Sequence, residues 1–247
     1  MKLLIIPDIH LKPWIFDLAD ELILKYKLDG AVFIGDLVDD WNKENDIELF
    51  RQTIERAIRF KQEHENTFWC YGNHEAGYLT KEGCAGNSRN YNIEISHLLH
   101  MYESIVEPQI VVVIDNVIFS HAGVTEEEAT DDKDIEKKYN SSGSLIRNMI
   151  DSGSPLWLRP DLWVNFYNKT QVVGHTPVKG IKQASIKSED WNHINPFQTR
   201  LKDADTTDKN TKVWFVDTFS TCPDGSEFGN HSFMSIDTIT TEVTIYE

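Results

Sequence analysis

Short apolar runs alternate with amphipathic stretches along the first part of the chain. Residues 2–6 and 31–34 are continuous apolar runs of the kind that form buried strands of a parallel sheet. Residues 14–27 and 47–63 carry apolar side chains at helical spacing, and residues 67–71 are a third apolar run. A helix between two strands returns the chain for parallel pairing, so this pattern predicts a βαβαβ unit with right-handed crossovers.

The second half of the chain is predicted to be mainly strands. Residues 110–114 and 117–119 flank the two-residue turn Asp115-Asn116, which predicts a hairpin. Before them, residues 80–92 are expected to form an exposed loop and residues 93–102 a helix. The remaining predicted strands include 172–173 and 179–186, and a second sheet is expected to contain 213–217, 232–236 and 242–246. The whole pattern indicates an α/β protein.

Two polar stretches interrupt these elements. The acidic and lysine-rich residues 125–138 are predicted to be a solvated helix face or a mobile loop. Residues 187–212 are polar and rich in turn-forming residues, which predicts a long excursion or a partly disordered loop. Neither stretch has the character of a linker, so residues 1–247 are expected to form a single domain.

Composition and charge narrow the classes of function. With 247 residues and 40% hydrophobic content, the chain can build one sizeable core. The formal net charge of −16 argues against general binding to nucleic acid or to an anionic membrane, because both need clustered Lys and Arg. A phosphate-bearing substrate would therefore have to be attracted locally, for example by metal ions.

The cysteines and the amino-terminal residues indicate the cellular location of the protein. Cys70, Cys84 and Cys222 lack the C-x-x-C spacing of a zinc or redox site, so we expect reduced thiols in a reducing cytosol. The first residues run directly into a predicted strand, which argues against a signal peptide. No apolar run approaches the roughly 20 residues of a membrane helix. These observations predict a cytoplasmic protein.

Polar residues with metal-binding or acid-base chemistry follow one predicted strand after another. Asp36 comes directly after the buried run 31–34, where a carboxylate emerges at the carboxyl edge of a sheet. Any one such cluster is more often an ordinary turn than a site, but a structural role gives no reason for the repetition. The set of candidate ligands is Asp8, His10, Asp36, Asn73, His121 and His175, and His74 offers an imidazole that could act as a general acid.

The chemistry of this set favours two metal ions. Hard oxygen atoms and imidazole nitrogens without a thiolate suit Mn²⁺, Fe or Zn²⁺ better than Ca²⁺ or a structural zinc. Asp36 has two oxygens and could bridge two cations. Two metals about 3.5–4 Å apart can bind a hydroxide between them and clamp the oxygens of a phosphoryl group. The set therefore predicts hydrolysis of phosphate esters by attack of a metal-bridging hydroxide.

The motifs D-I-H, G-D-L-V-D, G-N-H-E, S-H-A-G and G-H-T-P, in this order, resemble those of the calcineurin-like metallophosphoesterase superfamily. They run from Asp8 to His175 and cover about two-thirds of the chain. The resemblance implies a two-sheet mixed β-sandwich flanked by helices, a four-layer fold. It also implies a dinuclear metal centre.

The resemblance further implies a role for each matching residue. Asp8 and His10 would bind one metal and Asp36 would bridge. His74 would protonate the leaving oxygen, and Asp39 would orient His74 and stabilise its charge. The ligands implied for the other metal are Asn73, His121 and His175.

Within the superfamily, G-N-H-E and G-D-L-V-D are most similar to protein serine/threonine phosphatases and to related bacterial and phage phosphatases. The chain departs from that branch at two places: Leu11 stands where the branch has Gly, and Asp40-Trp41 where it has Arg-Gly. The missing arginine normally grips the substrate phosphate. Arg159 or Arg89 could supply that contact instead.

The expected function is a metal-dependent phosphoesterase, acting on monoesters. The substrate could be a phosphoprotein, a nucleotide or a small phosphoester. A dinucleoside polyphosphate hydrolase and a phosphodiesterase remain alternatives within this chemistry. A non-catalytic scaffold that binds proteins is the competing class, and it would be free to lose His74 or a metal ligand, which this chain retains.

Overall fold

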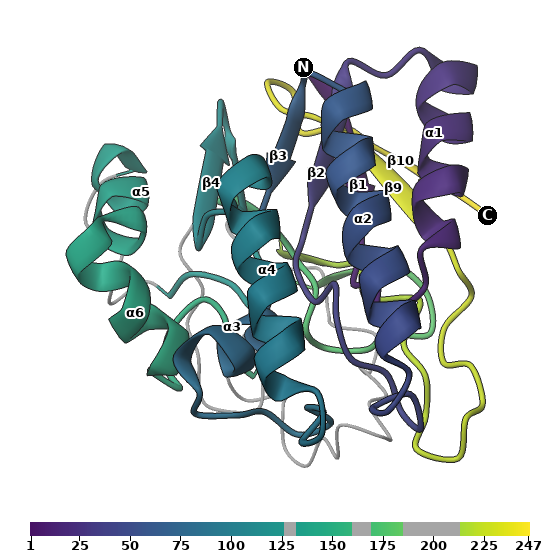
Figure 1. The fold of residues 1–247 in the computed structure, drawn as a ribbon. Helices are drawn as coiled ribbons and strands as arrows, with labels where there is room; N and C mark the ends of the chain where they lie inside the picture. Colours follow the sequence, from purple (N-terminus) through teal and green to yellow (C-terminus); the bar gives the residue numbers. More distant parts are fainter. Residues whose placement is uncertain (126–131, 160–168, 185–212) are drawn as a thin grey trace.

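The structure, a computed structural model, describes residues 1–125, 132–159, 169–184 and 213–247. In these residues the chain forms six helices and ten strands (Figure 1). The helices are α1 (Trp14–Tyr26), α2 (Ile47–Glu63), α3 (Asn73–Thr80), α4 (Asn92–Val106), α5 (Asp132–Asn140) and α6 (Ser142–Ile150). The strands are β1 (Lys2–Ile6), β2 (Gly30–Phe33), β3 (Thr67–Trp69), β4 (Val111–Ile114), β5 (Val117–Ser120), β6 (Thr170–Val173), β7 (Lys182–Ala184), β8 (Val213–Phe215), β9 (Phe233–Asp237) and β10 (Val243–Tyr246). The predicted excursion over residues 187–212 lies outside the described residues.

The first sheet has the strand order β10-β9-β1-β2-β3. Strands β1, β2 and β3 are parallel, with Leu4 opposite Ala31 and Phe33 opposite Trp69. Helices α1 and α2 connect them, so the predicted βαβαβ unit is confirmed. The apolar runs form these strands because both of their faces are buried, as the burial of all four residues of β2 shows.

The predicted placement of the last two strands is wrong. Residues 232–236 and 242–246 are expected in a second sheet, but β9 pairs with β1 and β10 pairs with β9, all antiparallel in the first sheet. Of this predicted set, only residues 213–217 contribute to the second sheet, as β8. An apolar run indicates a buried strand but carries no signal for which distant strand it pairs with.

The second sheet has the strand order β4-β5-β6-β8-β7. The predicted hairpin is confirmed, with Val112 opposite Phe119 in the antiparallel pair of β4 and β5. Strands β5, β6 and β8 are parallel neighbours, and β7 is antiparallel to β8. Both sheets are therefore mixed.

The two sheets and the helices form four layers. Leu4 and Ile6 of β1 pack in a core that also contains buried side chains of α1, α2 and α4. Leu3 and Ile5 point the other way, into a core shared with β5 and β6 of the second sheet. A third core joins that sheet to α5 and α6 through residues such as Ile118. The two-sheet sandwich flanked by helices is confirmed (Figure 1).

Two helices have no counterpart in the sequence prediction. Helix α3 begins inside the G-N-H-E motif and holds Gly77 in its interior, and glycine disfavours a helix. Helix α6 begins at Ser142, and the sequence analysis assigns no element to residues 142–150, although Leu145 and Met149 have helical spacing. Helix α5 agrees with the predicted helix face for the described part of residues 125–138. Within the described part of the chain, no helix has the length and apolar character to cross a membrane.

Candidate metal centre

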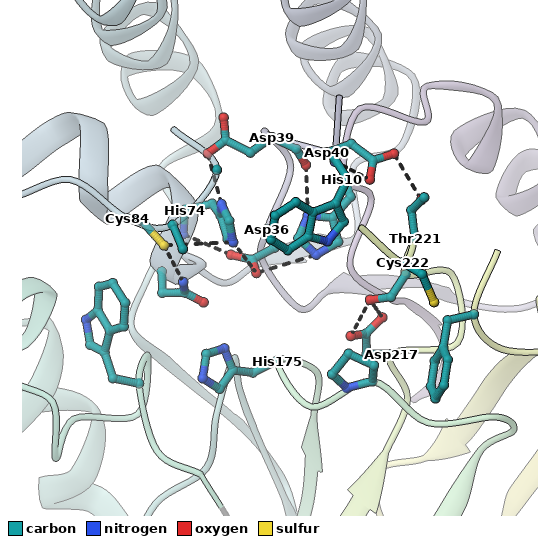
Figure 2. A pocket seen from close by; sticks show the side chains of 18 of the residues that line it. His10, Asp36, Asp39, Asp40, His74, Cys84, His175, Asp217, Thr221 and Cys222 are labelled. Atoms are coloured by element: carbon teal, nitrogen blue, oxygen red, sulfur yellow. Dashed lines mark hydrogen bonds and ion pairs between the residues drawn. The ribbon is translucent and has the colours of Figure 1, made fainter. Parts of the chain in front are cut away.

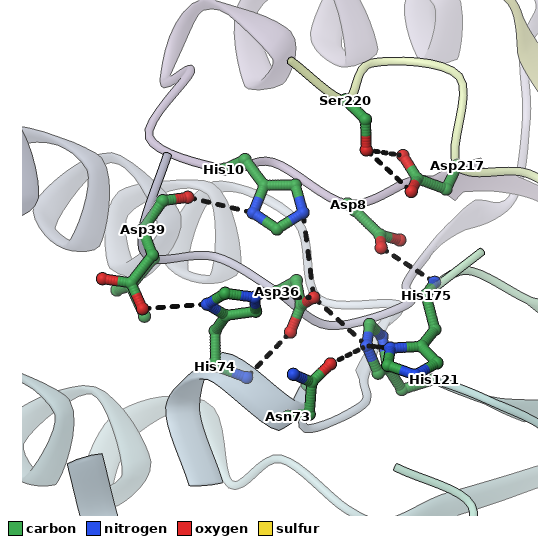
Figure 3. A network of polar contacts seen from close by, with 12 residues as sticks. Asp8, His10, Asp36, Asp39, Asn73, His74, His121, His175, Asp217 and Ser220 are labelled. Carbon is green, nitrogen blue, oxygen red and sulfur yellow. Dashed lines mark hydrogen bonds and ion pairs between the residues drawn. The ribbon is translucent and has the colours of Figure 1, made fainter. Parts of the chain in front are cut away.

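The polar residues that follow the strands meet at one edge of the two sheets (Figure 3). The carboxyl ends of parallel strands open at the same edge, where α/β sheets collect their ligands. The structure brings together all six predicted metal ligands and the predicted acid. Asp8 and His10 follow β1, Asp36 follows β2, Asn73 and His74 begin α3 after β3, His121 follows β5 and His175 follows β6.

Four of these side chains direct acceptor atoms at one small region between the sheets. The Nε2 atom of His121 lies 3.2 Å from Asp36 Oδ2 and 2.9 Å from Asn73 Oδ1. The same atom lies 3.1 Å from Nδ1 of His175. His121 Nδ1 lies 3.0 Å from the carbonyl oxygen of Ile34, which places the proton of the neutral ring on Nδ1. Buried lone pairs that face one another in this way are stabilised by a cation.

A neighbouring group shares Asp36 with the first. The Nε2 atoms of His10 and His74 lie 3.8 and 4.0 Å from Asp36 Oδ2. Nδ1 of His10 donates to the carbonyl oxygen of Asp39 at 2.9 Å, so Nε2 keeps its lone pair. In each group, the ligand atoms of three His or Asp side chains lie within 4.8 Å of one another. The arrangement offers two cation positions with Asp36 between them.

Asp8 lies on the side of the site where His10 lies (Figure 3). Its Oδ2 atom accepts a hydrogen bond from the backbone nitrogen of His175 at 2.8 Å. A Cβ atom on Gly174 would lie 1.9 Å from Oδ1 of Asp8, so the close approach of this carboxylate requires glycine there. Burial, and then the charges of Asp217 and Asp36, raise the pKa of Asp8 well above its usual value. A bound cation would have the opposite effect on this pKa.

The donor set fits two divalent cations. Asp8 Oδ1 and His175 Nε2 are buried and have no hydrogen-bond partner among the described residues. His10 and His121 each donate through Nδ1 to a backbone carbonyl, the usual support of a metal-binding histidine. Asn73 donates through Nδ2 to the sulfur of Cys84 at 3.2 Å, which turns Oδ1 toward the site. Oxygen and imidazole atoms of this kind suit Mn²⁺, Fe or Zn²⁺.

Several site residues have a left-handed backbone although they are not glycine. The φ angles of His10, Asp36, Asp39 and His175 are 46°, 56°, 64° and 61°. Such conformations cost on the order of 1 kcal/mol each and gather at functional sites, where the fold imposes them. Leu11 also has a positive φ of 57°, at the position where the resembling phosphatases have glycine. The tight turns after β1 and β2 aim the side chains at the shared edge.

The ring of His74 is held by Asp39, which is held in turn by two further side chains. Its Nδ1 atom lies 2.9 Å from Asp39 Oδ2, and Asp39 also accepts hydrogen bonds from Tyr78 Oη at 2.6 Å and Asn87 Nδ2 at 2.7 Å. Burial opposes the imidazolium form of His74. The charge of Asp36 and the hydrogen bond to Asp39 outweigh burial, so the pKa of His74 is raised well above its usual value. A protonated imidazole is therefore available at neutral pH.

The pKa values of three other titrating groups in the site are lowered, in contrast to that of His74. Burial lowers the pKa of His10 to about 4, despite the charge of Asp36. Burial and the charge of Arg159 hold the pKa of His175 well below its usual value. Burial alone would raise the pKa of Asp36, but neighbouring imidazoles such as His121 prevail and lower it well below its usual value. Neutral imidazoles and an ionised carboxylate are the forms that bind metals.

A cavity of about 380 Å³ opens over this site (Figure 2). Asp36, His74 and His175 form part of its lining, and Trp41, Trp157 and Phe228 give it aromatic walls. Its volume is in the range of small-molecule sites. The cavity therefore gives a ligand access to the acid and to both cation positions.

The two candidate arginines lie in different surroundings. Arg159 lines the cavity, and its Nη1 atom donates to the carbonyl oxygen of His175. Arg89 is exposed and is not among the residues that line the cavity. Asp40, which stands where the resembling phosphatases have arginine, forms an ion pair with Lys12 at 3.0 Å and accepts from Thr221 Oγ1 at 3.1 Å.

Glu75 supports the site, and the sequence analysis gives it no role. Its buried carboxylate accepts four backbone N–H groups: Oε1 from Leu37 at 2.7 Å and Val38 at 3.2 Å, and Oε2 from Asp36 at 3.0 Å and Gly72 at 2.8 Å. It thereby fixes the turn that carries Asp36 against the start of α3. An acid three residues after Gly72, where a helix begins, is the signal that could have indicated this capping role.

Replacement of Glu75 by glutamine is expected to destabilise the fold. Burial and the charge of Asp36 raise the pKa of Glu75 to about 7, so the comparison belongs near pH 8, where the carboxylate is ionised. The amide would turn its NH₂ group toward N–H donors and leave buried donors unpaired, at a cost of about 3 kcal/mol in total. For a chain of this size the Tm should fall by roughly 6–12 °C. Calorimetry measures this, the exposed Glu82→Gln is the control, and equal Tm values for both variants would contradict the assignment.

Asp217 is a second buried carboxylate that the sequence analysis leaves without a role. It lines the cavity, follows β8, and accepts Ser220 Oγ at 2.9 and 2.8 Å from its two oxygens. Burial raises its pKa to about 6; the bond from Ser220 opposes this change and the charge of Asp36 adds to it. The available signal is the one that indicates Asp36, an aspartate directly after a buried apolar run, here 213–216.

Comparisons with known proteins agree with this fold. No curated protein matches the chain. Among solved structures, a cold-active protein-tyrosine phosphatase from a psychrophilic Shewanella species is similar at a TM-score of 0.56 and 15% identity, over 100% of this chain and 80% of that one. A protein serine/threonine phosphatase from Saccharomyces cerevisiae is similar at a TM-score of 0.52 and 14% identity, over 100% of this chain and 79% of that one. At these identities the likeness concerns the fold alone.

The family is shown by a match of a different kind. The model of the calcineurin-like phosphoesterase family matches residues 1–205, which is most of the chain. These residues include all the motifs described above, from Asp8 to His175. This protein therefore belongs to the calcineurin-like phosphoesterases, a family of metal-dependent phosphoric ester hydrolases.

Proposed function

We propose that this protein hydrolyses phosphate monoesters at a site with two divalent cations. Asp8 and His10 would hold the first cation, and Asp36 would bind both. Support comes above all from one observation, the convergence of three buried ligand atoms. His121 Nε2 lies 2.9 Å from Asn73 Oδ1 and 3.2 Å from Asp36 Oδ2. The ligands proposed for the second cation are Asn73, His121 and His175. When bound, such cations supply a water nucleophile with a lowered pKa and neutralise charge on the phosphoryl oxygens.

His74 is the proposed general acid, and Asp39 its positioning residue. The leaving alkoxide of an ester needs a proton near neutral pH, and the imidazolium of His74 can donate one from Nε2. Asp39 accepts from Nδ1 at 2.9 Å, so it holds the ring with Nε2 toward the cavity. Tyr78 and Asn87 hold Asp39 in turn. These contacts give the acid one orientation.

The charges around the cavity favour a monoester over a diester. A monoester presents three terminal oxygens to the site and a diester presents two. Two cations and the guanidinium of Arg159 together offer three positive groups at this edge. Trp41 and Trp157 line the same cavity and suit a flat leaving group, so an aryl ester is the substrate of choice for an assay.

Arg159 is the proposed phosphate-binding arginine. Replacement of Arg159 by alanine should raise the KM for an aryl phosphate about tenfold or more, because a charge-assisted contact to phosphate is lost. Arg89→Ala is the matched control, since that side chain is exposed and does not line the cavity. Steady-state kinetics measure both. A higher KM for Arg89→Ala with an unchanged KM for Arg159→Ala would reverse the assignment.

The choice between substrate classes has a direct test. The Mn²⁺-loaded protein is given a nitrophenyl phosphomonoester and the matching bis-ester, and kcat/KM is compared. We expect the monoester to be preferred by about tenfold or more, which corresponds to about 1.4 kcal/mol in the transition state. A preference for the bis-ester would make the protein a phosphodiesterase. Mn²⁺ as the native metal and a cytoplasmic location stay predictions.

A further inference from the structure

We propose that Asp217 is a positioning residue for the first cation, the one that Asp8 and His10 would hold. Its carboxylate would be the third beside this cation, after those of Asp8 and Asp36. This inference rests on the proposed two-cation site. It concerns a residue that lies beyond the motifs from Asp8 to His175, at the end of β8.

The fold places Asp217 at this position. Strand β8 lies next to β6, and the backbone nitrogen of Val216 donates to the carbonyl oxygen of Val173 at 2.9 Å. The carbonyl oxygen of Asp217 accepts from the backbone nitrogen of Val178 at 2.8 Å. These bonds hold Asp217 against the loop that carries His175. Figure 3 shows its carboxylate on the side of the site where Asp8 and His10 lie.

The surroundings of Asp217 do not satisfy its charge. The side chain is 1% exposed, and Ser220 is its one hydrogen-bond donor in the described parts of the chain. The single hydroxyl proton of Ser220 cannot bond fully to both carboxylate oxygens, so acceptor capacity is left over. A buried carboxylate is costly unless it is paired or near a metal. Asp40, in the same cavity, is different because Lys12 pairs with it at 3.0 Å.

An independent observation points to a ligand at the same place. Oδ1 of Asp8 is buried and has no hydrogen-bond partner among the described residues. Burial raises the pKa of Asp8 most, and the charge of Asp217 raises it further, ahead of the charge of Asp36. Three buried carboxylates around His10 repel one another unless a cation lies among them. The first position is thus richer in carboxylate than the second, where Asn73, His121 and His175 are neutral ligands.

The test is titration of the metal-free protein with Mn²⁺ by calorimetry, for the wild type and Asp217→Asn. We expect two Mn²⁺ per wild-type chain, and one of the two affinities to fall about 10–100-fold in the variant, as for other residues that support metal ligands. Asp40→Asn makes the same chemical change at a carboxylate that Lys12 already pairs. This control should bind two Mn²⁺ with affinities within about threefold of the wild type.

A second readout separates this role from a structural one. Asparagine removes one charge from a repelling cluster, so the metal-free Asp217→Asn protein should melt no lower than the metal-free wild type, and Mn²⁺ should raise its Tm less. A lower Tm without metal, together with unchanged Mn²⁺ affinities, would show a structural role and overturn the inference. A wild type that binds fewer than two Mn²⁺ would overturn the proposed function as well. Two wild-type sites that persist unchanged in the variant would overturn the Asp217 inference alone.

Discussion

Replacement of Asp36 by asparagine is expected to abolish hydrolysis and to remove at least one cation. Asp36 Oδ2 lies 3.2 Å from Nε2 of His121 and 3.8 Å from Nε2 of His10, so it is the one side chain proposed to reach both cations. An amide is neutral and turns one NH₂ group toward the site. Metal ions contribute several kcal/mol to such reactions, so the rate should fall more than about 10³-fold.

The measurement is kcat/KM for an aryl phosphate together with the metal content of the purified protein. Asp40→Asn is the matched control, because it changes a cavity carboxylate that Lys12 already pairs at 3.0 Å. The control should keep two metals per chain. An Asp36→Asn protein that retains two metals and most of its activity would show that this carboxylate does not bridge.

Replacement of His74 by asparagine is expected to slow hydrolysis about 10²–10⁴-fold, the usual contribution of a general acid. The loss should depend on the leaving group. A nitrophenolate departs without a proton, whereas the alkoxide of an alkyl phosphate needs one, so the alkyl ester should lose far more rate. Metal content should stay at two per chain, because His74 is proposed to act as an acid and not as a ligand.

The pH dependence gives a second view of His74. Its pKa is raised above the usual value, so the imidazolium form persists at neutral pH and is lost as the pH rises through that pKa. The wild-type rate with an alkyl phosphate should therefore fall on the alkaline side, and the variant should lack this limb. His100→Asn is the control, since His100 is exposed on α4 and contacts Glu103 at 2.8 Å. Equal losses for alkyl and nitrophenyl esters would argue that His74 is not the acid.

The strands and the candidate site residues could be predicted from local sequence patterns because the site residues directly follow the strands. Each apolar run that forms a parallel strand is followed directly by the residue that enters the site, as Ile34 is followed after one glycine by Asp36. The edge at which parallel strands end then brings those residues together. This is why Asp8 and His175, far apart in the chain, could be expected at one place.

The parts that sequence missed depend on contacts between distant segments. Nothing near Glu75 in the sequence shows that it accepts the amides of residues 36–38, because the donors belong to another strand end. β9 has the pattern of a buried strand, but only the assembled sheet shows that it pairs with β1. Asp217 follows an apolar run as Asp36 does, but the sequence does not show that β8 lies beside β6.

The most direct test of the two-cation site is hydrolysis of a nitrophenyl phosphomonoester by metal-stripped wild-type protein to which Mn²⁺ is returned in steps. The structure predicts no turnover without metal and full recovery as two Mn²⁺ bind per chain. Turnover that is equal in the stripped and reloaded protein would contradict a metal-dependent mechanism. Two bound Mn²⁺ without hydrolysis of mono- or diesters would instead favour a binding scaffold.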